Sequence, residues 1–134
     1  MKDSKSDNSL TKVLVVEDEK AVLDLIVEIL KLDGHEVYRA FDGHHGLQMI
    51  EETDFDVVIT DFRMPQMTGL ELFREAKKCK PGIEKRFVFI SGEVDEHEQR
   101  SISRETGARF ISKPFHIKEI QGTVDELLLG KTGN

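Results

Sequence analysis

Residues 12–18 have the sequence KVLVVED, in which a short apolar run leads directly into two carboxylates. Similar runs occur at 56–61 (DVVITD) and 86–92 (RFVFISG). Short, nearly continuous apolar runs rich in β-branched and aromatic residues are typical of strands buried on both faces of a parallel sheet. We therefore predict three central strands, at 12–16, 56–60 and 86–91.

Two further segments, 36–40 and 109–112, are predicted strands that contain more polar residues, as edge strands do. Amphipathic segments follow the five strands, and the helices that they predict are 20–32, 43–52, 68–78, 94–106 and 117–129. Strictly alternating strands and helices predict an α/β fold with a parallel sheet covered on both faces. A doubly wound, five-stranded, flavodoxin-like sheet of order 2-1-3-4-5 fits this pattern, with a binding crevice at the carboxyl ends of strands 1 and 3.

The predicted helices differ in how firmly they would be anchored. Thr68 and Glu71 have the spacing of a capping box at the start of the third helix. The fourth helix contains only Val94 and Ile102 as clear apolar residues, and Gly107 ends it. We therefore expect the fourth helix to be weakly anchored.

Length and composition limit the class of protein. The 134 residues suit one domain, which we place at 11–129, between a disordered tail at 1–10 and a tail or linker start at 130–134. A net charge of −7 disfavours direct binding to nucleic acid, and the apolar runs are too short to cross a membrane. One cysteine excludes a disulfide framework and a thiolate-rich zinc site, and it indicates a reducing compartment, the cytosol.

Polar side chains follow four of the predicted strands at the point where each strand ends. They are Glu17-Asp18, Asp61, Ser91-Gly92 and Lys113-Pro114. Parallel strands bring these groups to one rim of the sheet, where carboxylates would repel one another unless a cation neutralised them. Oxygen ligands with room for water suit Mg²⁺. A carboxylate beside Mg²⁺ and a lysine can act as a nucleophile toward phosphorus.

These residues resemble the receiver domains of response regulators in two-component signalling, the CheY-like superfamily. The resemblance covers about 12–129. It is carried by the four motifs at the strand ends together with Pro65 and Gly69, which follow Asp61 at the family's spacing. Each motif is weak alone, but the four in order at the right strand ends are specific.

The resemblance implies a phosphoacceptor and a metal site. Asp61 would accept a phosphoryl group from a sensor histidine kinase or a phosphotransfer protein. Asp18, Asp61 and the backbone carbonyl of Arg63 would bind Mg²⁺, and Glu17 would act through water. The domain would catalyse only its own phosphorylation and dephosphorylation and would not be a turnover enzyme.

The resemblance also implies a switch. Ser91 and Lys113 would bind the acyl phosphate, and the ring of Phe110 would turn inward as Ser91 moves. The site would be shaped by Pro65, Gly69, Gly92 and Pro114, with a cis bond before Pro114. The surface of the fourth helix, fifth strand and fifth helix would contact a downstream partner or output domain that the sequence does not identify, or a second copy in a homodimer.

Arg63 and Glu93 are expected to form an ion pair at the mouth of the site. Arg63 and Glu93 each lie two residues past a site residue, so we expect an ion pair that partly covers the acyl phosphate and slows hydrolysis. Exposed pairs of this kind are worth under about 1 kcal/mol.

Other protein classes, and purely structural roles for the same residues, fit the sequence less well. A phosphatase of the haloacid-dehalogenase type needs a second Asp two residues after the nucleophile, where this chain has Arg63. A flavin site needs a phosphate loop after the first strand, where Glu17-Asp18 would repel phosphate. A degenerate receiver that acts as a scaffold would not need an intact Asp61, Ser91 and Lys113. Taken singly, each Asp would be a helix N-cap, Lys113 a solvated side chain and Phe110 part of the core.

Overall fold

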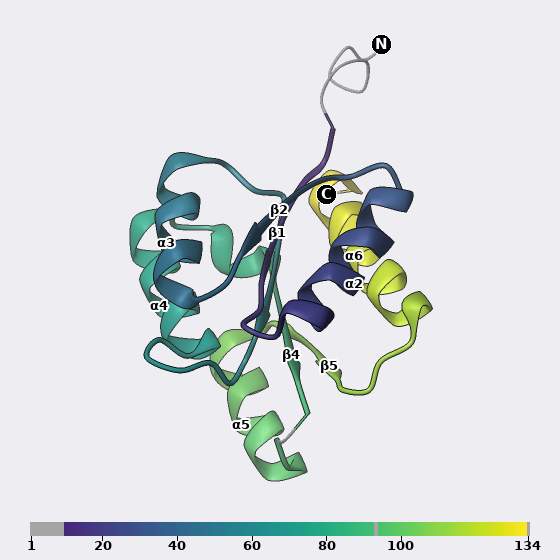
Figure 1. The fold of residues 1–134 in the computed structure, drawn as a ribbon. Coiled ribbons are helices and arrows are strands. Elements are labelled where there is room, and N and C mark those ends of the chain that lie inside the picture. Colours follow the sequence, from purple (N-terminus) through teal and green to yellow (C-terminus); the bar gives the residue numbers. More distant parts are fainter. Residues whose placement is uncertain (1–9, 93, 134) are drawn as a thin grey trace.

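The computed structural model describes residues 10–92 and 94–133, in which strands and helices alternate along the chain (Figure 1). Five parallel strands form one sheet of order β2-β1-β3-β4-β5. In chain order, the strands are β1 (Lys12–Val16), β2 (Glu36–Ala40), β3 (Val57–Asp61), β4 (Phe87–Ser91) and β5 (Arg109–Ser112). The predicted fold class and strand order are therefore confirmed.

Helices cover both faces of the sheet because neighbouring side chains of a strand point in opposite directions. They are α2 (Lys20–Leu32), α3 (Gly43–Glu52), α4 (Gly69–Cys79), α5 (Glu96–Thr106) and α6 (Ile117–Gly133). Val13 and Val15 of β1 belong to the core cluster that includes residues of α2 and α6. Leu14 and Val16 belong to the opposite cluster, with residues of α3, α4 and α5.

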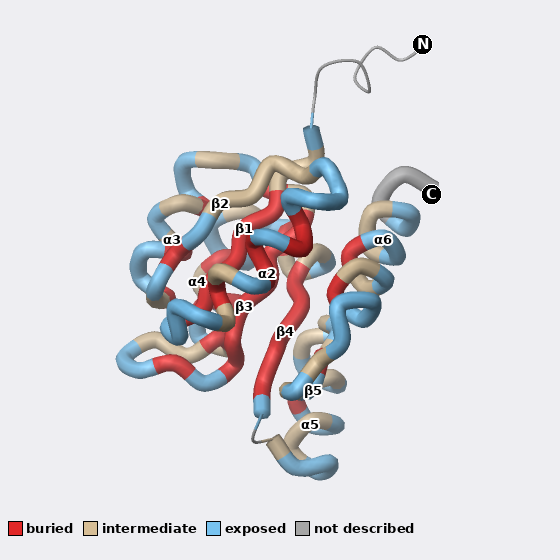
Figure 2. Tube along the Cα trace, turned by 45° about the vertical axis from the view of Figure 1, so that its right-hand side comes forward, coloured by how far each residue is buried: buried red, intermediate tan, exposed pale blue. Residues whose placement is uncertain are grey.

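Burial follows the predicted distinction between central and edge strands. Figure 2 shows β1, β3 and β4 buried along almost their whole length. Strands β2 and β5 are partly exposed. The polar interruptions in the sequences of these two strands therefore mark the edges of the sheet.

Several predicted boundaries shift for local reasons. A turn of 3-10 helix, η1 (Ile83–Arg86), precedes β4, and the strand begins at Phe87. The side chain of Asp95 accepts a hydrogen bond from the Glu98 amide at 2.7 Å and caps α5, so that helix begins at Glu96 and not at Val94. The last helix continues past Leu129 to Gly133.

Other features of the helices agree with the sequence. The Thr68–Glu71 capping box is present at the start of α4. Gly107, which ends α5, has a positive φ of 69°. Ile102 is the buried residue of α5 among those described, and Figure 2 shows the rest of this helix partly or fully exposed. The fourth predicted helix is therefore weakly anchored, as expected. The tail predicted at 1–10 lies, apart from Leu10, outside the described residues.

Candidate functional site

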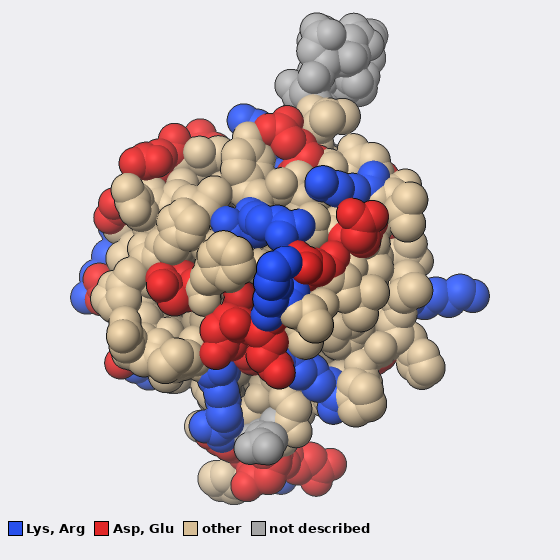
Figure 3. Space-filling model, in the orientation of Figure 1, with Lys and Arg blue, Asp and Glu red and all other residues tan. Residues whose placement is uncertain are grey.

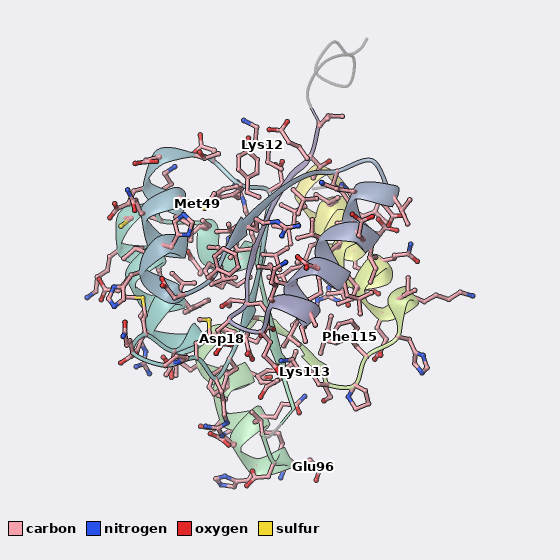
Figure 4. All side chains as sticks on the ribbon, in the orientation of Figure 1. Lys12, Asp18, Met49, Glu96, Lys113 and Phe115 are labelled. Atoms are coloured by element: carbon pink, nitrogen blue, oxygen red, sulfur yellow. The ribbon has the colours of Figure 1, made fainter. Side chains whose placement is uncertain are left out.

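The strand register brings the predicted carboxylates together. Val16 pairs with Thr60, so Glu17 and Asp61 follow at the same level on neighbouring strands. Carboxylate oxygens of Glu17, Asp18 and Asp61 lie within 4.8 Å of one another. Figure 4 shows Asp18 at the end of the sheet from which α5 also extends. The predicted acidic group is therefore one cluster.

Lys113 reaches this cluster from the opposite side of β4. Its Nζ lies 3.3 Å from Glu17 Oε1, 3.5 Å from Asp61 Oδ2 and 3.4 Å from Glu19 Oε1. The Lys113 amide donates to the carbonyl of Ser91 at 2.9 Å, which fixes the start of the loop beside β4. Figure 3 shows acidic and basic side chains gathered into one group at this end of the molecule, next to α5.

Glu19 is a residue of the site that the sequence analysis did not assign. It is the N-cap residue of α2, and it lines the same hollow as Asp61 and Lys113. Its side chain is 65% exposed, in contrast to the buried Glu17. The signal available in the sequence was the third consecutive carboxylate after β1.

Burial and mutual repulsion control the protonation of the two inner carboxylates. Glu17 is 1% exposed and Asp61 is 6% exposed. Burial and then the charge of Asp61 raise the pKa of Glu17 from 4.5 to about 7. Burial also raises the pKa of Asp61, although the ammonium of Lys113 opposes this rise.

Lys113 is charged in this setting. Partial burial alone would lower the pKa of its ammonium, but the charges of Asp61 and Glu17 together raise it. One ammonium therefore faces several carboxylates, and the cluster keeps excess negative charge that a cation would neutralise.

One buried oxygen points to the same conclusion. Among the described residues, Oε1 of Glu17 accepts no hydrogen bond, although it lies near Nζ of Lys113. A buried acceptor without a hydrogen-bond donor is costly unless water or an ion satisfies it. Three carboxylates with hard oxygen ligands fit Mg²⁺, and Oε1 of Glu17, which has an ion pair with Lys113 but no hydrogen bond, fits one of the waters of that ion.

The space beside Asp61 is a hollow of about 230 Å³. It is lined by Glu19, Asp61, Arg63, Ser91, Gly92 and Lys113. All of these residues except Glu19 are predicted from the sequence. Ser91 is buried at the carboxyl end of β4 and lines the hollow.

Of the predicted site-shaping residues, Gly92 lines the hollow, and the others lie near site residues in the chain. A Cβ on Gly69 would come within 2.5 Å of the Asp61 carbonyl oxygen, so the first residue of α4 packs directly on the backbone of β3. Pro65 lies in the loop between these two elements, and its carbonyl accepts a hydrogen bond from the Met67 amide at 2.8 Å. A Cβ on Gly92 would contact Lys113 Cβ at 3.5 Å. The bond between Lys113 and Pro114 is cis, as expected.

Phe110 is connected to the site by contacts with other aromatic rings. Its ring centroid is 5.8 Å from that of Phe62 and 5.9 Å from that of Phe89. The side chain is partly buried on β5. These contacts place Phe110 against the residue that follows Asp61.

Arg63 has an acidic partner on α5 that the sequence does not predict. Its Nη2 donates to both carboxylate oxygens of Glu98, at 2.9 and 3.1 Å. The Arg63 amide donates to Asp61 Oδ1 at 3.4 Å. Glu93, the predicted partner, lies outside the described residues.

Comparison with known proteins identifies the family. Residues 13–125 match the family model of the response regulator receiver domain. The chain belongs to this family. The receiver domain is also 37% identical over 118 residues to the sensor kinase CckA of Brucella abortus (strain 2308). That alignment covers 87% of this chain but only 12% of the kinase, so the chain spans a small part of that relative's length.

Solved structures agree with this assignment. A CheY-like receiver domain protein from Methanospirillum hungatei JF-1 is 30% identical, with a TM-score of 0.83, and the match covers 94% of this chain and 100% of that one. A receiver domain from Clostridium thermocellum is 30% identical, with a TM-score of 0.81 and coverage of 91% and 97%. The receiver domain of the hybrid histidine kinase CckA is 32% identical, with a TM-score of 0.71 and coverage of 87% and 98%. Within the described residues, no helix is long and apolar enough to span a bilayer.

Proposed function

We propose that this receiver domain takes a phosphoryl group onto Asp61 from the phosphohistidine of a sensor histidine kinase or a phosphotransfer protein. The observation that carries the proposal is the position of Lys113 Nζ, 3.5 Å from Asp61 Oδ2. In the reaction, a carboxylate oxygen of Asp61 forms a bond to phosphorus while the nitrogen–phosphorus bond of the donor breaks. The electron pair of that bond stays on the imidazole nitrogen, and the product is an aspartyl phosphate.

The neighbouring side chains fit the charge changes of this step. Lys113 lies close enough to stabilise negative charge on the transferring oxygens. The hydroxyl group of Ser91 lines the hollow and would donate a hydrogen bond to the phosphoryl group. Both residues would then hold the acyl phosphate.

Mg²⁺ is the cofactor that we propose for phosphorylation of Asp61. Asp18, Asp61 and the backbone carbonyl of Arg63 would bind it, and Glu17 would act through a water molecule. The ion supplies positive charge that offsets the carboxylates and the incoming phosphoryl group. The unsatisfied oxygen of Glu17 supports this assignment.

The output would be a change in the face formed by α5, β5 and α6. Support comes from α5, which buries only Ile102 among its described residues, and from the ring contacts that connect Phe110 to Phe62 beside the site. Weakly held elements are the ones that a small bias can move. This face would bind a downstream partner, an output domain or a second copy of the chain.

The proposal extends to the domain's enzymatic activity, its location in the cell and nucleic-acid binding. It would act only on its own aspartyl phosphate and would not turn over metabolites. It would work in the cytosol, where the exposed thiol of Cys79 stays reduced. It would not bind nucleic acid directly, because its net charge is −7.

Acetyl phosphate provides a direct test. The protein is incubated with acetyl phosphate and Mg²⁺, and its intact mass is recorded beside Asp61→Asn and an EDTA control. We expect one phosphoryl adduct that needs the metal and is lost in Asp61→Asn. Because some receiver domains accept phosphate only from a protein donor, beryllofluoride is titrated in parallel. Absence of both the adduct and beryllofluoride binding would overturn the proposal.

A further inference from the structure

Among the residues that the structure describes, two ion pairs connect the weakly anchored helix α5 to the rest of the domain. Arg63 donates to both carboxylate oxygens of Glu98 near the start of α5, at 2.9 and 3.1 Å. Arg74 of α4 donates to both oxygens of Glu105 in the last turn, at 2.8 and 3.0 Å. Paired hydrogen bonds between an arginine and a carboxylate are the most directional form of ion pair. Because α5 buries little apolar surface, ion pairs contribute a larger share of its attachment to the domain than they do for the other helices.

Only one of the two arginines is connected to the phosphorylation site. Arg63 lines the hollow beside Asp61, and its amide donates to Asp61 Oδ1. Its guanidinium carbon lies 5.9 Å from the ring centroid of Phe62, so the side chain lies over the first residue past Asp61. Arg74 does not line that hollow. The two pairs are alike in residue types and exposure and different in position. They also differ in geometry, because Arg63 donates to both oxygens from Nη2 alone, whereas Arg74 donates from Nε and Nη2.

We propose that Arg63 couples phosphorylation of Asp61 to release of the first turn of α5. In the unphosphorylated domain the guanidinium binds Glu98. A phosphoryl group on Asp61 carries more negative charge than one carboxylate and offers three acceptor oxygens, so it competes for the same guanidinium. When Arg63 turns to the phosphoryl group, Glu98 loses its partner and the start of α5 is freed. This inference rests on the proposed function, because it requires the phosphoryl group on Asp61.

Thermodynamic linkage predicts how much loss of the Glu98 charge changes the affinity for a phosphoryl mimic. If phosphorylation weakens the Arg63–Glu98 pair, then loss of the Glu98 carboxylate, with Arg63 retained, must favour phosphorylation by the same factor. Both side chains are about half exposed, which limits the strength of the pair. Glu98→Gln is therefore expected to raise the affinity for beryllofluoride, a phosphoryl mimic, by about two- to fivefold.

The chain offers a matched control and a second variant that is not expected to show the gain in affinity. Glu105→Gln weakens the other arginine pair on the same helix and is expected to leave beryllofluoride affinity unchanged. Arg63→Gln removes the competing guanidinium itself and is expected to leave the affinity equal or lower. The Glu98 amide, which Asp95 caps, is retained in Glu98→Gln, so the helix start keeps its backbone hydrogen bond.

The experiment titrates beryllofluoride with Mg²⁺ into the four proteins and follows amide hydrogen exchange in α5. In the wild type and Glu105→Gln, we expect beryllofluoride to speed exchange at residues 98–102. In Glu98→Gln, exchange there should already be fast, and the mimic should add little. Equal affinities in Glu98→Gln and the wild type, or equal shifts in Glu98→Gln and Glu105→Gln, would overturn the coupling while leaving Asp61 as acceptor. A wild type that does not bind beryllofluoride would overturn the proposed function and this inference together.

Discussion

Nζ of Lys113 lies 3.5 Å from Oδ2 of Asp61, although β4 separates the strands that carry the two residues. The lysine side chain crosses the end of β4 beside Gly92, where a Cβ would contact the lysine stem at 3.5 Å. The pair thus depends on three strands that end at one level. This arrangement places a positive charge where an incoming phosphoryl group would need it.

Removal of the Lys113 charge should slow phosphorylation more than any other change outside the carboxylates. Lys113→Met is expected to lower the rate of adduct formation from acetyl phosphate by about a hundredfold, because a preorganised cation at the transferring group is lost. Lys113→Arg keeps the charge and should retain part of the rate. Intact mass followed over time gives both rates. A Lys113→Met rate within about threefold of the wild type would mean that the ammonium does not act on the reacting group.

Stability of the metal-free protein should depend on the protonation of Glu17. Its pKa is about 7 in the folded chain, against an ordinary value of 4.5. Between these values the folded state binds more protons than the unfolded state, so the free energy of unfolding falls as pH rises from about 4.5 to about 7. Glu17→Gln removes this contribution and should exceed the wild type in stability at pH 8 by up to about 3 kcal/mol. Urea unfolding at pH 5, 6, 7 and 8 measures the difference, which should shrink toward pH 5.

Mg²⁺ binding should show the opposite dependence on pH. The metal needs ionised carboxylates, so protons compete with it below about pH 7 and its affinity should fall by up to about tenfold per pH unit. Titration calorimetry at pH 6, 7 and 8 measures this affinity, and Asp18→Asn serves as the control with a disrupted site. An affinity that stays constant or increases as pH falls would contradict the assignment of the cluster as the metal site.

The two glycines near the site should respond differently to an added methyl group. In Gly69→Ala, the new Cβ would be 2.5 Å from the Asp61 carbonyl oxygen and 2.9 Å from Phe62 Cα, so backbone must move. We expect a loss of about 1–3 kcal/mol in the free energy of unfolding. Gly92→Ala meets its nearest atom at 3.5 Å and should change stability by less than about 0.5 kcal/mol. Equal losses by urea unfolding would show that close packing at Gly69 does not limit stability.

The centre of the site was predictable because it depends on strand ends. Each main site residue lies at the carboxyl end of a predicted strand, and parallel pairing brings these ends together. The residues are Glu17, Asp61, Ser91 and Lys113. Strand order and the capping box of α4 are likewise local or topological features that the sequence carries.

The rest depends on side-chain packing across the chain. The pair between Arg63 and Glu98 depends on where the first turn of α5 lies, which a count of residues from the strand ends does not predict. The contact of Glu19 with Lys113 likewise joins two distant segments through flexible side chains. The turn η1 is too short to produce a periodic pattern.

Chemical mapping of the acceptor tests the central claim most directly. The domain is phosphorylated with acetyl phosphate and Mg²⁺, reduced with borohydride to convert aspartyl phosphate to homoserine, and digested with trypsin. Asp61 lies in the peptide 40–63 and Asp18 in the peptide 13–20, so the two candidates separate by peptide mass. Our account predicts homoserine at position 61 only, and none when Mg²⁺ is withheld. Homoserine at position 18 or at another carboxylate, with Asp61 unmodified, would contradict it.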